Sequence, residues 1–325
     1  MEKERYHNID FLRIIFINAI IIHHFYHMET GIWNSGGYAV ELFFIISGFV
    51  FNISYDKTKT VIDFIRSKLT FFLPLLIFTS TTLSIFGKFH IQKLLADLFL
   101  LQRTGLYSDG GGYNRPAWFI SVLFWELLFI FCLRKNIPEK VTNLILGILT
   151  FASLIFIVNN VKDTYQLKHL CRGFSSISIG YFCAEFIKVI PSYNKQKKSI
   201  IATAFEASVL LYLIKILFST YKVQNVVAIM LLMGILIISF SLKKGYIGSF
   251  LNKKIFTTIS IYVFPIYMTH GLWYRKPFFP YIQKICDNRM ILLFIIGIFI
   301  SWSMGIILYH LIQVPCKRYL TNKFK

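Results

Sequence analysis

The sequence predicts an all-α fold, a polytopic transmembrane bundle of about ten helices, from three observations. The chain has 325 residues and is 56% apolar and 18% aromatic but only 15% charged, with a mean hydropathy of +0.60. A soluble protein of this size cannot bury that much apolar surface, whereas lipid solvates it. Apolar runs long enough to cross a bilayer recur from end to end. No appended soluble domain or linker divides them, so residues 1–325 are expected to form a single integral membrane domain.

The expected helices follow one another with mostly short connections. The first run carries an arginine, an aspartate and several histidines, and no small-residue cleavage site follows it. It is therefore expected to be a retained helix and not a signal peptide. The expected spans are roughly 9–28, 37–55, 68–87, 116–134, 141–159, 173–190, 199–218, 223–242, 255–273 and 289–312.

Basic residues are divided unevenly between the two sides of the membrane. Of the 35 Lys and Arg, about 22 fall on the side that holds both termini and about 12 on the other. The positive-inside rule therefore puts both termini in the cytoplasm. The net charge of +20 is mostly a signal of topology, aided by attraction to anionic lipid, and no nucleic-acid partner is expected. The basic inner loops are YDKTKTVIDFIRSK, LRKNIPEK, PSYNKQKK and LKKGYIGSFLNKK.

The first span carries two polar residues that are costly in lipid. Arg13 and His24 are 11 residues apart, a step that on an α-helix returns to within roughly 20° of the same face and climbs about 16 Å. A permanent cation and a titratable imidazole on one face need a protein-lined or hydrated cavity, and such residues usually mark a functional site. A plainer alternative is that Asp10, within about 60° of Arg13, simply holds the guanidinium.

Helices two and nine bring two further ionisable groups to the depth of His24. Glu41 lies about one turn inside the outer end of the second span, and His270 reaches nearly the same level in the ninth. An imidazole oriented by a carboxylate is a competent general base for a hydroxyl nucleophile. We therefore predict that His24, Glu41 and His270 form a catalytic cluster near the outer surface.

Plainer roles for these residues stay open. Glu41 would otherwise make a structural hydrogen bond between helices one and two. The backbone carbonyl freed by Pro265 would otherwise explain the polarity at His270. A histidine near a helix end often simply lies at the membrane interface, and this is an open role for His23 or His27.

The second helix contains a serine–glycine pair, Ser47 and Gly48, within FFIISGF. This pair is most simply a close-packing notch between helices. Ser47 as a covalent nucleophile is the weaker alternative, because no base is obvious beside it.

Five cysteines show neither a CxxC motif nor cysteine–histidine metal spacing, so no metal site is predicted. Cys171 and Cys286 both fall near the outer face, where a disulfide could form. For this pair we favour the role of free, small apolar side chains that fill space between helices over a disulfide.

Two basic residues, Arg66 and Lys68, precede helix three on the cytoplasmic side. Basic residues at this place commonly do no more than obey the topology rule. Together with Arg13, however, they would make a cationic mouth for a phosphate-bearing cytosolic donor.

Two outer loops are longer than the rest. In the first, roughly 88–115, IQKLLADLFLLQ is amphipathic at helical spacing and is expected to lie at the outer surface or to re-enter the membrane. SDGGGYNRP follows it and is at most a hinge or lid, because it lacks the lysine of a phosphate loop. The second loop, WYRKPFFPYIQKICDNR, is rich in aromatic and basic residues, which suits sugar stacking and interfacial anchoring alike.

Several segments match, in order, a pattern known from one protein family. They are NIDFLR, GYAVELFFIISGF, the Arg66/Lys68 segment up to Pro74, PAWFISVLF, RGFSSISIGYF, SIYVFPIYMTH and QVP. The chain resembles the acyltransferase-3 family of integral membrane sugar O-acyltransferases, in a form without a fused extracytoplasmic domain. The resemblance covers essentially the whole chain, and FFIISGF together with the Arg13-to-His24 spacing is its most specific part.

The resemblance implies a transmembrane O-acyltransferase, most simply an O-acetyltransferase. Its donor would be a cytoplasmic acyl-CoA, usually acetyl-CoA, and its acceptor a hydroxyl of an extracytoplasmic polysaccharide or lipid-linked glycan. By analogy Arg13 and His24 are the essential pair, and Arg66 and Lys68 contact the CoA phosphates. The protein would be a multi-pass protein of the bacterial inner (cytoplasmic) membrane, surrounded by lipid.

The chain departs from the family's pattern at three places. Many members have an arginine where Phe71 stands, and a glutamate where Leu123 and Gln313 stand. The carboxylate nearest to Leu123 is Glu126, about one turn further on. A divergent acceptor or a different acyl group is the expected consequence.

Two other classes of function fit the same residues less fully. A transporter or flippase for a glycan or lipid would use the polar cavity as a substrate path and would need no acyl-CoA. The lack of a convincing internal repeat weakens that alternative. A non-catalytic scaffold leaves the four candidate residues Arg13, His24, Glu41 and His270 unexplained.

Overall fold

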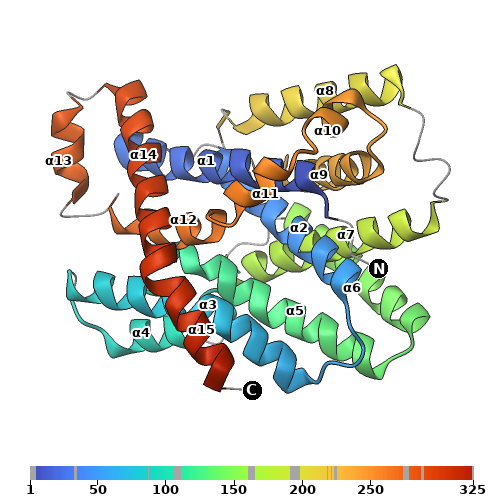
Figure 1. The fold of residues 1–325 in the computed structure, drawn as a ribbon, viewed down its shortest axis with the longest axis horizontal. Helices are drawn as coiled ribbons and strands as arrows, with labels where there is room; N and C mark the ends of the chain where they lie inside the picture. Colours follow the sequence, from blue (N-terminus) through green and yellow to red (C-terminus); the bar gives the residue numbers. More distant parts are fainter. Residues whose placement is uncertain are drawn as a thin grey trace.

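The computed structural model describes residues 5–32, 35–86, 88–105, 111–159, 165–190, 198–217, 219–220, 222, 225–273, 278–286 and 289–323. Within these ranges the chain is built from helices, and the predicted all-α fold class is confirmed (Figure 1). The longer helices are α1 (His7–Thr30), α2 (Ala39–Ser54), α3 (Val61–Ile85), α5 (Trp118–Asn136), α6 (Glu139–Asn159), α7 (Tyr165–Val189), α8 (Ile200–Leu217), α9 (Asn225–Leu242) and α14 (Met290–Leu308). The shorter elements are η1 (Ser35–Tyr38), α4 (Ile91–Leu98), η2 (Arg115–Ala117), α10 (Tyr246–Phe250), α11 (Lys254–Ser260), α12 (Val263–Thr269), η4 (His270–Leu272), α13 (Phe278–Ile285), η5 (Tyr309–Gln313) and α15 (Val314–Lys323).

Within the described ranges, seven helical segments are long and apolar enough to cross a membrane. Each overlaps one of the ten predicted spans, and α3, α7 and α8 overlap the other three. The chain is therefore a polytopic helical bundle. The seven segments are His7–Thr30, Ser35–Ser54, Arg115–Asn136, Glu139–Asn159, Asn225–Leu242, Lys254–Leu272 and Met290–Lys323.

Helix α3 begins earlier than predicted, at Val61 instead of roughly 68. Thr60 and Asp63 form a reciprocal cap at its start. The Asp63 N–H donates to Thr60 Oγ1 over 3.1 Å, and the Thr60 N–H donates to Asp63 Oδ2 over 3.1 Å. Such a cap satisfies N–H groups that the first turn leaves unpaired, so the helix extends beyond its apolar part into a polar segment.

Helix α2 is the interior helix of the bundle. In the most apolar window of Ser35–Ser54, 78% of the residues are buried, against 22% for Glu139–Asn159. The side chains of α2 therefore face protein on nearly all sides, whereas α6 presents most of its surface outward. Charged groups on α2 therefore need partners on neighbouring helices.

Helices α2 and α7 cross in close contact at two glycines. An added Cβ on Gly48 would lie 1.9 Å from the carbonyl oxygen of Ile177, and one on Gly180 would lie 1.8 Å from the carbonyl oxygen of Ile45. Glycine, which has no Cβ, permits this approach of two backbones. The predicted packing notch at Gly48 is confirmed, and Gly180 is its counterpart on α7.

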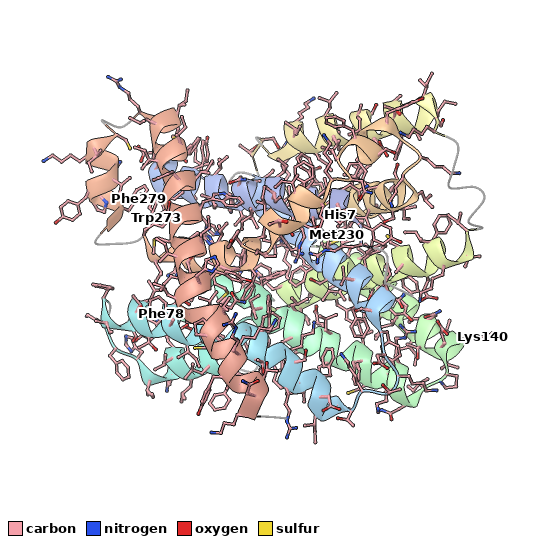
Figure 2. All side chains as sticks on the ribbon, in the orientation of Figure 1. His7, Phe78, Lys140, Met230, Trp273 and Phe279 are labelled. Atoms are coloured by element: carbon pink, nitrogen blue, oxygen red, sulfur yellow. The ribbon has the colours of Figure 1, made fainter. Side chains whose placement is uncertain are left out.

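One end of the bundle is called the histidine end below, because His24 of α1 meets His270 there. The short helices α4 and α13 lie at this end (Figure 1). Phe25 packs there on Trp273, with ring centroids 4.1 Å apart, and on Phe279 of α13 at 6.3 Å (Figure 2). The distribution of charge in the sequence predicts that the histidine end faces the outer side of the membrane.

The two long loops at this end each contain a helix. Helix α4 agrees with the helix predicted for the first loop, whose residues 106–110 lie outside the described part of the chain. Helix α13 in the second loop was not predicted, and residues 274–277 and 287–288 lie outside the described part. Cys171 and Cys286 are both free, which agrees with apolar filling and not with a disulfide.

A buried carboxylate holds the loop between α4 and α5 in place. Asp97 Oδ2 accepts the backbone N–H of Tyr113 over 3.0 Å and that of Asn114 over 3.2 Å. Asn114 Nδ2 in turn donates to the carbonyl oxygen of Met268 over 3.1 Å. Asp97 thus ties the loop to α12, immediately before His270.

This carboxylate gives the loop a pH-dependent stability. Burial raises the pKa of the Asp97 carboxyl to about 6, above its ordinary range. Because the folded-state pKa is the higher one, the stabilisation is complete below about pH 4 and is lost as the pH rises through about 6. We expect a loss of at most about 3 kcal/mol in the local opening free energy of residues 111–115, and Asp97→Asn should abolish this pH dependence.

Hydrogen exchange of the 111–115 amides at pH 4 and pH 7, corrected for intrinsic rates, measures this effect. Asp63→Asn is the matched control, because Asp63 is exposed and distant in sequence from the loop. Equal protection at the two pH values in the unaltered protein would contradict the prediction.

Candidate active site

Arg13 and His24 lie on one unbroken helix, since α1 runs from His7 to Thr30. The Arg13 Nη1 atom donates to Asp10 Oδ1 over 3.4 Å, and the side chain is 34% exposed. The expectation that Asp10 holds the guanidinium is confirmed. The Arg13 Nε atom is buried and makes no hydrogen bond to any described residue. This N–H is therefore available to a ligand.

Asp10 is the centre of a polar network between α1 and α11. Its Oδ2 atom accepts from Thr257 Oγ1 over 2.6 Å and from Arg5 Nε over 3.2 Å. His7 Nδ1 lies 2.6 Å from the same Thr257 hydroxyl oxygen. The network anchors the first turns of α1 to α11 and so positions Arg13.

The imidazole rings of His24 and His270 are neighbours, with centroids 5.1 Å apart. His270 is fully buried, and its Nδ1 lies 2.6 Å from the carbonyl oxygen of Tyr267. Because a carbonyl only accepts, Nδ1 carries the proton and Nε2 carries the lone pair of the neutral ring. A neutral imidazole with a fixed tautomer is suited to take a proton from a hydroxyl group. The structure thus brings the two predicted histidines together.

His23 is buried within the bundle, so protein surrounds its imidazole. Its ring lies 5.2 Å from that of His24, centroid to centroid. A Cβ on Gly37 would lie 3.2 Å from His23 Nε2, so the turn η1 folds closely over this imidazole. The chain after α1 covers the ring, which sequence position alone did not indicate.

Glu41 makes a buried ion pair with Arg172 of α7. The Arg172 Nε atom donates to Glu41 Oε1 over 2.5 Å, and Glu41 is fully buried. Charges in such a place are tolerated when they are paired, and here the Glu41 Oε1 atom is paired with Arg172 whereas Oε2 makes no hydrogen bond to a described residue. The bond joins α2 to α7. The structural hydrogen bond that was the alternative role for Glu41 is therefore made, but to α7 and not to α1.

Arg172 is a residue that the sequence analysis did not single out. The expected span began at 173, whereas α7 begins at Tyr165, which places Arg172 about two turns inside the helix. The guanidinium carbon of Arg172 also lies 5.8 Å from the ring centroid of Trp118 on α5. The signal that could have revealed it was an arginine beside a predicted span, with the carboxylate of Glu41 near the same depth.

A chain of aromatic ring contacts runs from α2 through α5 and α12 to His270. Phe119 of α5 packs on Phe44 of α2, with ring centroids 4.4 Å apart, and on Tyr267 of α12 at 5.3 Å. Tyr267 in turn lies 5.7 Å from the ring of His270. These rings give the histidines a largely apolar surrounding, in which charges interact more strongly than in water.

Ser47 does not have the environment of a nucleophile. Its hydroxyl donates to the carbonyl oxygen of Phe43, one turn earlier in α2, over 2.7 Å. This is an ordinary way for a serine to satisfy itself within a helix. Glu126 is buried as well, and neither of its carboxyl oxygens makes a hydrogen bond within the described chain.

The two basic residues expected to bind a donor lie near the start of α3. Arg66 is exposed, and Lys68 is partly buried with its ammonium nitrogen 5.5 Å from the ring centroid of Phe64. Helix α15 packs against α3 and carries two exposed cations, Lys317 and Arg318. The cationic character predicted for this part of the molecule thus extends to the last helix.

A family model for the acyltransferase-3 proteins, described as an acyltransferase domain, matches residues 6–310. The chain belongs to this family. It is therefore a membrane acyltransferase. Comparison with curated proteins and with solved structures gave no match.

The acyltransferase differs from the family's pattern at three places, and the structure shows what stands there. Phe71 packs on Phe264, with ring centroids 4.5 Å apart, and Leu123 is buried in the core. Gln313 is buried at the end of the π-helical turn η5, where the amide oxygen makes no hydrogen bond to a described residue. Apolar packing thus replaces two charged side chains, and a neutral amide replaces the third. Single π-helical turns within α-helices occur frequently at functional sites.

The motifs shared with the acyltransferase-3 family meet in two clusters. Glu41, Trp118 and Arg172 come from three motifs and form the ion-pair cluster between α2, α5 and α7. His24 and His270 come from two others and form the second cluster at the histidine end. The first is suited to hold helices together, and the second is suited to move a proton.

Proposed function

We propose that the acyltransferase transfers an acyl group, most simply acetyl, from a cytoplasmic acyl-CoA to a hydroxyl of an extracytoplasmic polysaccharide or lipid-linked glycan. It would do so as a multi-pass protein of the bacterial inner membrane with both termini in the cytoplasm. The contact between His24 and His270 carries the proposal. The Nδ1 atom of His270 donates to a backbone carbonyl oxygen, which leaves Nε2 to exchange a proton with a substrate, at the end of the bundle that the charge distribution assigns to the outer side.

The transfer step is ordinary acyl substitution. The pair His24–His270 accepts the proton of the glycan hydroxyl while the hydroxyl oxygen attacks the thioester carbonyl. The carbon–sulfur bond then breaks, and the imidazolium returns the proton to the CoA thiolate. The products are an ester of the glycan and free CoA.

The donor would enter from the opposite end of the bundle. Arg66 and Lys68 are candidates to hold the CoA phosphates, because cations on flexible side chains pair readily with phosphate. Arg13 lies about 16 Å along α1 from His24 and has a buried N–H without a partner in the described chain. We assign it to the arm of the donor that reaches between the helices toward the histidines.

Labelled acetyl-CoA, added to purified protein in liposomes with an acceptor glycan, tests the function. The expected result is label on the glycan that depends on the protein, with labelled free acetate as the matched control donor. Passage of the glycan across the bilayer without label would instead identify a transporter or flippase and overturn the proposal.

A further inference from the structure

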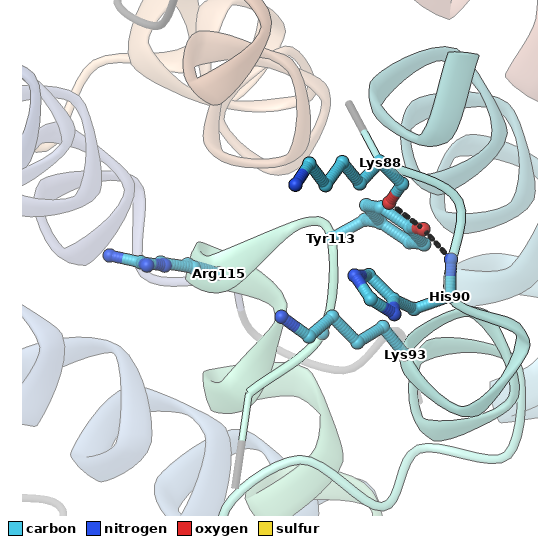
Figure 3. Close-up of a pocket in the computed structure, with 6 residues that line it drawn as sticks. Lys88, His90, Lys93, Tyr113 and Arg115 are labelled. Atoms are coloured by element: carbon cyan, nitrogen blue, oxygen red, sulfur yellow. Dashed lines mark hydrogen bonds between the residues drawn. The ribbon is translucent and has the colours of Figure 1, made fainter. Parts of the chain in front are cut away.

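A pocket at the histidine end is lined by basic side chains from two segments of one loop. Its volume is about 220 Å³, and its lining is Lys88, His90, Lys93, Gly112, Tyr113 and Arg115. Figure 3 shows the side chains of Lys88 and Lys93 extending in the same direction, with the rings of Tyr113 and His90 between them and Arg115 extending away on the far side. The chemistry of this lining favours an anion.

The pocket is built on fixed backbone. The Tyr113 hydroxyl donates to the carbonyl oxygen of Lys88 over 2.8 Å and accepts the N–H of His90 (Figure 3). Both oxygens of Asp97, behind the pocket, are occupied by donors of the protein: the Tyr113 and Asn114 N–H groups and the side-chain amide of Gln102. The two segments that carry the cations are thus held together.

The loop that lines the pocket is bonded to α12, the helix that directly precedes His270. Asn114 Nδ2 donates to the carbonyl oxygen of Met268 over 3.1 Å. Tyr267 donates from its hydroxyl to the carbonyl oxygen of Pro116 over 2.7 Å. A group bound in this pocket would therefore be held on a loop that is bonded directly to the segment before His270.

Membrane topology does not account for these cations. The positive-inside rule concentrates lysine and arginine on the cytoplasmic side, whereas the histidine end is the predicted outer side. The volume is below the roughly 300–1,000 Å³ of a site for a whole small-molecule ligand, so it suits one group of a larger molecule. We propose that this pocket binds a phosphate or carboxylate group of the acceptor glycan, so that the enzyme selects acidic acceptors. The inference rests on the proposed function.

The test compares Lys88→Gln/Lys93→Gln and Arg115→Gln with Lys284→Gln, which removes an exposed lysine of α13 outside the pocket. Purified proteins in nanodiscs of zwitterionic phosphatidylcholine are titrated calorimetrically with inorganic pyrophosphate. We expect binding by the unaltered protein and by Lys284→Gln, and a loss of at least about tenfold in affinity for each pocket variant. Equal binding by all four proteins would overturn the proposal.

Acyl transfer provides the second measurement. With an acidic acceptor, the pocket variants should raise KM at least about tenfold and leave kcat nearly unchanged, because the lost charge pairs serve binding. With the carboxyl-reduced, neutral form of the same glycan they should have no effect. An equal effect on both acceptors would overturn the proposal.

Two further outcomes are informative. One tells whether the bound anion belongs to a glycan or to a lipid headgroup, and the other tells whether the acyl-transfer proposal or the anion-site proposal has failed. Effects of the variants that arise only in nanodiscs of anionic phosphatidylglycerol would assign the pocket to a lipid headgroup and overturn the choice of the glycan. If the protein transfers no label to any acceptor while pyrophosphate binding depends on the pocket, the acyl-transfer proposal fails and the anion site stands.

Discussion

His24→Ala is expected to lower the rate of acyl transfer by at least about 10²-fold, with the protein still folded and inserted. The physical reason is the loss of one of two imidazoles whose rings lie 5.1 Å apart at the histidine end. General-base catalysis by a positioned side chain contributes about 10²–10⁴-fold to the rate. The imidazole of His270 remains in the variant, but it lies at a different position and does not replace that of His24. The measurement is kcat with labelled acetyl-CoA and an acceptor glycan.

His27→Ala is the matched control, because His27 lies one turn further along α1 and is partly exposed. It should retain most of the activity. A His24→Ala protein that elutes as folded and transfers acetyl at the normal rate would contradict the assignment of the site.

Arg13→Ala tests the other member of the pair and should raise KM for the donor more than it lowers kcat.

Gly180→Ala is expected to destabilise the protein by about 3 kcal/mol or more. The added Cβ would lie 1.8 Å from the carbonyl oxygen of Ile45, and backbone cannot move aside as a side chain would. Helices α2 and α7 must therefore separate, which also strains the buried ion pair of Glu41 with Arg172. The measurement is thermal unfolding in detergent together with the yield of monodisperse protein.

Gly147→Ala is the control for this substitution. Its added Cβ would meet nothing nearer than Phe182 Cζ at 4.0 Å, so the helix α6 should tolerate it. A midpoint of unfolding for Gly180→Ala equal to that of Gly147→Ala would show that the crossing of α2 and α7 is looser than the structure has it.

Much of the architecture could be predicted because membrane helices are specified locally. The apolar runs predicted a polytopic helical bundle, and the small residue Gly48 predicted a close crossing. The amphipathic segment predicted α4. Less could be predicted where a polar segment forms helix, as at the capped start of α3, or where an apolar segment is too short to cross the membrane, as in α13, because hydropathy marks only long segments that lipid surrounds.

The candidate site, like the fold, could be predicted from the sequence only in part. Depth along each helix could be counted from the sequence, and the structure brings His24 and His270 into contact as that count predicted. The partner of Glu41 could not be counted, because it lies on α7, more than a hundred residues away. The buried position of His23 and the basic pocket beside Tyr113 also depend on how loops fold back onto helix ends.

The sequence by itself therefore determined that the chain forms a membrane bundle, where most of its long helices lie, and that His24 and His270 share one level, since these follow from local hydropathy and from the rise of the helix. The tertiary structure decided which groups share an environment: histidine with histidine, Glu41 with Arg172, and Asp97 with the loop that carries the cations. The reason is that lipid-facing helices are alike in composition, so their neighbours are chosen by close packing and by polar pairs between distant segments.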